Sequence, residues 1–195
     1  MRTTTARTTT LAAAAVLLLA ACGGTDLPGY GSGVDPTGPA ASASSRGPAQ
    51  DGFTDPAEVA EAEPGGAMLL TVTDVRVEEH DGFDRVVLLL DGDGSPSWRV
   101  GHVDAALDPG TGEPVAVDGD AVLEVALTGT AMPMDSGVTE YGGDPVDGPG
   151  GAVEQVVYGF VYEGTTSVFV GVTDERPFRV EVQEDPPAVT VDVQH

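Results

Sequence analysis

The sequence predicts an all-β fold: a β-sandwich of roughly eight mostly antiparallel strands over residues 66–195. Short runs rich in valine and aromatic residues recur along this part of the chain, and Gly, Pro and Asp punctuate them. No helical period of useful length interrupts the runs. Strands with one apolar face must bury it, and two packed sheets do so with a single core in a domain of this size.

The strand prediction follows the runs in chain order. They span residues 68–77, 83–91, 97–105, 121–129, 153–164, 166–174, 178–185 and 188–195. Residues 85–90 are apolar on both faces, which predicts a central strand, whereas 178–182 and 189–193 alternate and should bury one face. The connection 129–151 is longer than connections usually are, so it is either functional or a disordered acidic insertion.

The amino terminus predicts export. Residues 1–21 combine two arginines with an apolar run, 11–21, that is shorter than the about 20 residues a membrane-spanning helix needs. The run ends in Leu-Ala-Ala-Cys followed by two glycines, which resembles the bacterial lipobox. The resemblance implies lipidation of Cys22 and an anchor on the extracytoplasmic face of the cell membrane. A secreted protein cut nearby, or a short uncleaved anchor, remains an alternative.

Residues 22–65 predict a disordered tether. The segment is rich in Gly, Pro, Ala and Ser and has few large apolar side chains, so it cannot bury enough surface to offset its chain entropy. Within it, residues 55–63 could form a short acidic helical turn, with Asp55 as cap and Pro56 at the first position. The tether would hold the 66–195 domain away from the lipid surface.

Composition excludes several functions. The chain has 8 Lys+Arg, all of them arginine, and 32 Asp+Glu, for a net charge of -24. Such a chain will not bind nucleic acid through phosphate contacts, nor anionic lipid through a basic patch. Its single cysteine excludes an intramolecular disulfide and a thiolate-rich zinc site. We expect no cofactor.

The acidic pairs do not predict a catalytic or metal site. Asp91 with Asp93, and Asp118 with Asp120, lie in glycine-rich segments, where carboxylates usually form turns. The segment from Asp91 fails as a calcium loop because proline replaces the required glycine. No catalytic motif occurs, although an envelope enzyme, for instance a glycosidase using acidic turn residues, remains the weaker alternative.

Arginines within predicted strands suggest a ligand site. Candidate contacts are Arg85, Trp98, Arg99, Tyr162 and Arg179. Three planar guanidinium groups on an acidic body could grip a carboxylate or a sugar. The alternative is that each arginine pairs across the sheet with a carboxylate such as Asp84, Asp104 or Glu181.

Three segments resemble the AMIN-like domain of actinobacterial cell-envelope lipoproteins. They are "HDGFDRVVLLLDG", "WRVGHVD" and "PFRVEVQEDPPAVTVDVQH", with "GFDRVV" and "DPPxxxVDVxH" the most specific. The resemblance implies a noncatalytic β-sandwich that targets peptidoglycan or the division site. Where the related ending often has arginine, this chain has Ala188. We therefore expect a lipid-anchored module binding peptidoglycan; the alternative is a protein-interaction module whose exposed strands pair with another envelope protein.

Overall fold

The computed structural model describes residues 52–63 and 65–195, with the backbone alone for residues 65–68. The predicted signal peptide, Cys22 and most of the predicted tether lie outside the described residues. Among the residues described, no helix is both long enough and apolar enough to cross a membrane.

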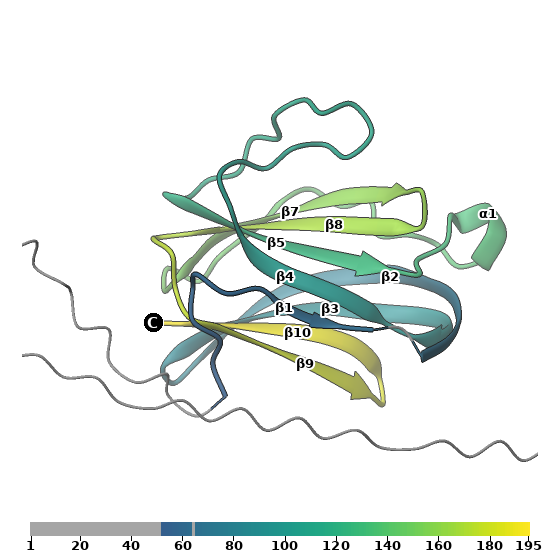
Figure 1. Ribbon diagram of the computed structural model, residues 1–195, viewed down its shortest axis with the longest axis horizontal. Coiled ribbons are helices and arrows are strands. Elements are labelled where there is room, and N and C mark those ends of the chain that lie inside the picture. The colour runs from purple at the N-terminus through teal and green to yellow at the C-terminus, as the bar shows by residue number, and fades with distance from the viewer. Residues whose placement is uncertain (1–51, 64) are drawn as a thin grey trace, which may run out of the picture. The chain divides into compact units, whose positions relative to one another are not determined.

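The all-β prediction is confirmed by two antiparallel sheets that lie one above the other (Figure 1). The four-stranded sheet has the order β2 (Gly65–His80), β3 (Phe83–Ser95), β10 (Pro187–Gln194) and β9 (Phe178–Glu184). The six-stranded sheet has the order β1 (Ala60–Ala62), β4 (Ser97–Val103), β5 (Ala121–Thr128), β8 (Thr165–Val172), β7 (Val153–Tyr162) and β6 (Val146–Asp147). Each predicted run forms one strand, and among the strands of the described residues only the short β1 and β6 were not predicted.

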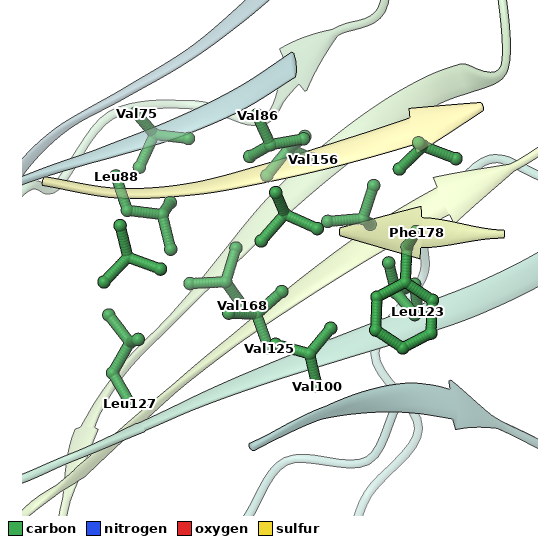
Figure 2. Close-up of a cluster of buried hydrophobic side chains, with 14 of the residues drawn as sticks. Val75, Val86, Leu88, Val100, Leu123, Val125, Leu127, Val156, Val168 and Phe178 are labelled. Carbon is green, nitrogen blue, oxygen red and sulfur yellow. The ribbon is translucent and has the colours of Figure 1, made fainter. Parts of the chain in front are cut away.

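The core lies between the sheets and consists mainly of valine (Figure 2). Val189, Val191 and Val193 of β10 are 0% exposed and face side chains such as Val125 and Val168 from the other sheet. Each such side chain contributes about 1.5–3 kcal/mol when fully buried. β3 lies between β2 and β10, so the predicted central strand is confirmed.

The segment Asp91–Ser95 differs from its predicted glycine-rich turn. It continues β3, where Asp91 pairs with Thr71 and Gly94 with Met68 of β2. Gly92 has a φ of 111°, and a Cβ there would lie 2.1 Å from the carbonyl oxygen of Leu69. Glycine therefore lets the two strands stay paired at a backbone conformation that other residues avoid.

The ordered domain begins earlier than predicted, so the expectation of disorder is wrong for residues 52–63. Thr54 bridges to Phe178 at the start of β9, with the Thr54 N–H donating to the Phe178 carbonyl at 2.7 Å. The predicted turn forms over Asp55–Glu58, where the N–H of Glu58 donates to the Asp55 carbonyl and the N–H of Ala57 to the Asp55 carboxylate, each at 2.9 Å. Residues 60–62 then pair with β4 as a strand. Residues 52–63 therefore run from the β9 edge of the four-stranded sheet to β4 of the six-stranded sheet.

The long connection 129–151 is ordered rather than floppy. It contains a short helix, α1 (Pro133–Ser136), and β6. Its backbone bonds to the outer edge of β2: Ala131 N–H donates to Leu70 O, and Tyr141 N–H to Val72 O, each at 2.8 Å. The connection thereby covers an edge strand that would otherwise present unpaired backbone groups.

The connection 104–120 lies against the outer face of the six-stranded sheet. A Cβ at Gly171 of β8 would fall 1.9 Å from the Asp118 carbonyl oxygen and 2.8 Å from Val117. Phe169, two residues earlier on the same face of β8, is 1% exposed. The tip of this connection, Asp108–Gly110, consequently reaches the end of β7.

Candidate functional site

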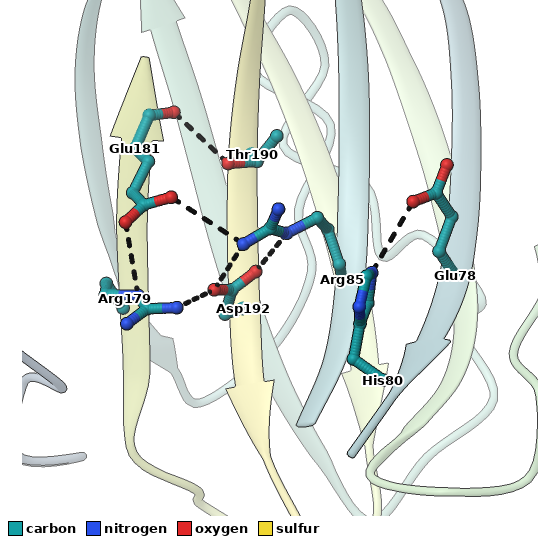
Figure 3. Close-up of polar contacts among 7 residues, drawn as sticks. All are labelled: Glu78, His80, Arg85, Arg179, Glu181, Thr190 and Asp192. Atoms are coloured by element: carbon teal, nitrogen blue, oxygen red, sulfur yellow. Dashed lines mark hydrogen bonds and ion pairs between the residues drawn. The ribbon is translucent and has the colours of Figure 1, made fainter. Parts of the chain in front are cut away.

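Two of the predicted ligand-binding arginines meet on the outer face of the four-stranded sheet (Figure 3). Arg85 of β3 donates to Asp192 of β10 through Nε at 2.6 Å and Nη2 at 2.9 Å. Arg179 of β9 donates to the same carboxylate at 2.5 Å. Strand register makes Glu78, Arg85, Asp192 and Arg179 neighbours in one row of alternating charge, which we call the charged face.

The Asp192 carboxylate accepts hydrogen bonds from both guanidinium groups. Its side chain is 1% exposed, whereas those of Arg85 and Arg179 are 18% and 27% exposed. Burial alone would raise the pKa of Asp192, but the hydrogen bonds from the two arginines outweigh it and hold that pKa below its usual value. The bond to Asp192 also raises the pKa of Arg85. A ligand carboxylate would have to displace Asp192 to use the same donors.

Glu181 and aromatic rings complete the surroundings of these arginines. The Glu181 carboxylate lies 3.6 Å from nitrogens of both Arg85 and Arg179. The Arg179 guanidinium lies 4.9 Å from the ring centroid of Phe53 and 5.7 Å from that of Phe83. The predicted alternative, cross-strand pairing with a carboxylate, therefore describes these two arginines, with Asp192 as the main partner.

A second buried carboxylate, Asp84, joins the two sheets. Asp84 of β3 is 0% exposed and accepts hydrogen bonds from the backbone N–H groups of Ala152 and Val153 at 2.7 and 2.9 Å. Its other oxygen lies 2.9 Å from Nε2 of His195. A Cβ at Gly151 would fall 2.5 Å from the carboxylate, so the close approach requires glycine. Asp84 thus pairs with His195 rather than with an arginine.

Sequence reasoning missed Asp192 and His195 as partners, although the signal for them was present. The two most specific segments of the resemblance, "GFDRVV" and "VDVxH", contain all four residues of these pairs. The structure connects the segments through Arg85 with Asp192 and Asp84 with His195. The motif residues therefore hold strands of the sandwich together. Ala188, at the position where the related ending has arginine, is 1% exposed between Leu89 and Gln183.

Trp98 and Arg99 lie on the other sheet, away from the charged face. Both belong to β4, where Arg99 is exposed and has Glu61 of β1 as its cross-strand neighbour. Trp98 faces the opposite way and packs against the core. Its Nε1 makes no hydrogen bond to any described residue. The five predicted residues thus do not form one site.

Tyr162 lies at a cavity of about 390 Å³ at the end of β7, which we call the β7 cavity. The cavity is lined by Asp108, Pro109, Gly110, Val115, Tyr158, Gly159, Phe160, Val161 and Tyr162. Phe160 is 61% exposed and Tyr162 is 42% exposed, which is unusual for large aromatic side chains. Phe160 and Tyr158 were not predicted as contact residues.

A bulge in β7 positions the rings. Gly159 pairs with Ser167 and Val161 with Thr166, which leaves Phe160 outside the register. Glu140, from the long connection, accepts hydrogen bonds from the Tyr158 hydroxyl at 2.8 Å and from the Val161 N–H at 3.0 Å. Burial, together with the bond to Glu140, raises the pKa of Tyr158 far above its usual value, so the phenol stays neutral.

The opposite wall of the cavity is a tight turn built on Asp108. One carboxylate oxygen of Asp108 accepts hydrogen bonds from Gly110 N–H, Thr111 N–H and the Thr111 hydroxyl, at 3.0, 2.7 and 2.9 Å. The backbone bond from Thr111 lowers the pKa of Asp108, which keeps the group ionised. A Cβ at Gly110 would lie 3.2 Å from the Tyr162 ring, so glycine lets the turn contact the ring.

Neither of two cavities formed by the described residues brings together the paired carboxylates of a glycosidase. Such enzymes use two carboxylates flanking the scissile bond. One carboxylate, that of Asp108, lines the β7 cavity, and one, that of Glu184, lines a cavity of about 240 Å³ beside β9. Over residues 52–63 and 65–195, no cluster of His, Cys, Asp and Glu could hold a metal ion.

Comparison with known proteins finds one family. A model of the AMIN-like domain matches residues 70–195, which include every strand but β1 and the beginning of β2. No curated protein and no solved structure matches the chain. The matched family is one of noncatalytic binding domains associated with the cell wall.

Proposed function

Because the chain belongs to the AMIN-like domain family, we propose that it is a lipid-anchored module of the cell envelope that contacts peptidoglycan. The match over residues 70–195 is the observation that carries the proposal, since it covers nearly the whole sandwich. The anchor would be Cys22, and the protein would act on the outer face of the cytoplasmic membrane.

The charge distribution restricts how such a module could bind. The chain carries a net charge of -24, and the bacterial wall is itself anionic, so long-range attraction cannot drive contact. The two arginines of the charged face are already paired with Asp192. Binding would therefore depend on directed hydrogen bonds and aromatic packing, or on bridging divalent cations.

The direct test is retention of the full chain by insoluble peptidoglycan, measured by sedimentation with and without Ca²⁺. We expect retention in at least one condition. Retention in both supports direct contact, whereas retention that EDTA abolishes supports bridging cations. If the protein stays in the supernatant in both conditions, peptidoglycan is not its ligand.

The anchor is tested separately. We expect mass spectrometry of the native protein to find residue 22 as the amino terminus and bearing acyl chains, because two buried chains hold a protein at a membrane where one does not. The Cys22→Ser variant should leave the membrane fraction, while Thr25→Ala, just beyond the lipobox, should remain. An unmodified Cys22 in the native protein would refute the anchor.

A second candidate function, binding of another envelope protein, is favoured by the edge of β9. Among the described residues, β9 has an outer partner only at Phe178, where Thr54 pairs with it. Val182 farther along is 46% exposed. An extended partner segment could add a strand there. Crosslinking in cells should give one dominant protein adduct that Val182→Pro removes; scattered adducts would contradict this candidate.

A further inference from the structure

The β7 cavity combines exposed aromatic rings with a strand bulge that hydrogen bonds hold in place. Phe160 and Tyr162 present large apolar surfaces to solvent, at 61% and 42% exposure. Phe160 lies at the bulge, and Glu140 holds the bulge through the Tyr158 hydroxyl and the Val161 N–H. Bulges commonly re-aim side chains next to binding sites. A volume of about 390 Å³ falls within the usual range for small-ligand sites.

One long connection of the domain lines this cavity, and the other bonds to the strand that forms its opposite side. Connection 104–120 supplies Asp108, Gly110 and Val115, and connection 129–151 supplies Glu140 behind the rings. Loops carried by a rigid sheet are where binding residues concentrate. The aromatic contacts continue inward from Phe160 to Tyr158, with ring centroids 5.7 Å apart, and from Tyr158 to Tyr141, 5.4 Å apart. The Phe160 ring therefore packs against two further rings whose positions are set by the fold.

The polar groups that line the cavity disfavour a negatively charged ligand. No arginine or histidine lines it, and its one charged side chain is the carboxylate of Asp108. One oxygen of this carboxylate is used by the turn, while the other accepts no hydrogen bond from the described residues. A phosphate or carboxylate ligand would be repelled. A hydroxyl-rich ligand could donate to Asp108.

The combination of aromatic faces and a free acceptor oxygen fits a sugar ring. A pyranose has an apolar face of C–H groups that packs on an aromatic ring, while its hydroxyls point outward and donate to carboxylates. We propose that the β7 cavity binds one neutral pyranose unit of a glycan chain, with its apolar face on Phe160 and Tyr162 and a hydroxyl on Asp108. The inference rests on the proposed function and assigns peptidoglycan contact to the glycan strand rather than to the peptide stems.

The test uses the full chain and two soluble probes, an N-acetylglucosamine tetrasaccharide and a free stem peptide, titrated into the protein and followed by NMR. We expect the tetrasaccharide to bind and to shift tyrosine ring signals. Phe160→Ala and Tyr162→Ala should each weaken binding by about tenfold or more, equivalent to about 1.4 kcal/mol. Asp108→Asn, which keeps the shape and weakens the acceptor, should weaken it less.

Met134→Ala is the matched control, because Met134 is 84% exposed on α1 and does not line the cavity. Its affinity should match that of the unaltered chain, and circular dichroism should show each variant folded. Tetrasaccharide binding that the ring substitutions leave unchanged would overturn the assignment. So would binding of the stem peptide alone that these substitutions abolish.

Sedimentation with peptidoglycan separates this inference from the proposed function. If the unaltered chain and the Phe160→Ala, Tyr162→Ala double variant sediment equally, the protein contacts peptidoglycan and the cavity is not the site. If the unaltered chain binds the tetrasaccharide through the two rings but does not sediment with peptidoglycan, the cavity binds glycan and the proposed ligand is wrong.

Discussion

The charged face and the β7 cavity both present polar and aromatic side chains at the surface, but their groups are satisfied in opposite ways. On the charged face, Asp192 is 1% exposed and accepts from two arginines. At the cavity, Phe160 is 61% exposed, and one oxygen of Asp108 has no hydrogen bond from a described residue. The polar groups of the charged face are therefore bonded to one another, whereas the cavity has an exposed ring and a carboxylate oxygen that a ligand could contact.

This difference separates residues that hold the fold from residues available for binding. The paired groups of the charged face belong to strands β3, β9 and β10, and they connect segments far apart in sequence. The cavity is built where connection 104–120 meets the bulged strand β7. In this chain, the specific sequence motifs therefore mark structural pairs, whereas the candidate binding surface lies at a connection.

The largest expected effect on stability concerns Asp84, the buried carboxylate that bonds to the backbone of Ala152 and Val153 and to His195. Asp84→Ala would leave two buried backbone N–H groups and His195 without their acceptor. We expect a loss of about 3–5 kcal/mol in the free energy of unfolding, measured by urea denaturation. Asp93→Ala, an exposed carboxylate on the same strand, should stay within about 0.5 kcal/mol. Equal effects of the two substitutions would contradict a structural role for Asp84.

The next effect compares two arginines that the sequence did not distinguish. Arg85→Ala removes a bidentate partner of the buried Asp192, so we expect a loss of about 2–4 kcal/mol in the free energy of unfolding. Arg99→Ala removes an exposed side chain from β4, and about 0.5 kcal/mol or less should be lost. Both values come from the same denaturation experiment. A weak effect at Arg85 would mean that its guanidinium is available to a ligand after all.

The pH dependence of stability should report on the charged face. The pKa of Asp192 is lower in the folded protein than its unfolded value of about 3.9. The stabilisation is therefore complete above that value and is lost as the pH falls through the lower folded pKa. Urea denaturation from pH 6 to pH 2.5 should show the loss, and Asp192→Asn should flatten this part of the curve. An unchanged slope in the variant would assign acid sensitivity to other carboxylates.

The fold was predictable because its signals are local. Alternation of apolar residues in segments such as 178–182 and 189–193 predicts strands with one buried face, and both segments form β9 and β10. The strand β1 was missed because three residues in a polar segment have no alternation to detect. Its strand state comes from pairing with β4, which is a tertiary effect.

The site was less predictable because its contacts are distant in sequence. Arg85 and Asp192 are 107 residues apart, so no local pattern identifies them as partners. Phe160 was missed for a different reason. The alternation in "VVYGFVY" does not reveal the bulge, which moves the ring out of register with β8. Tyr162 was selected as a candidate, but the turn at Gly110 that forms a wall beside it could not be foreseen.

The smallest expected effect distinguishes the cavity rings from structural aromatics. Phe160→Ala removes a ring that is mostly in solvent, so the free energy of unfolding should change by about 0.5 kcal/mol or less. Phe178→Ala, which empties a site that is 0% exposed, should cost about 3–5 kcal/mol. Thermal or urea unfolding of both variants gives the contrast. If Phe160→Ala costs as much as a core substitution, the ring supports the bulge, and its exposure no longer argues for a ligand.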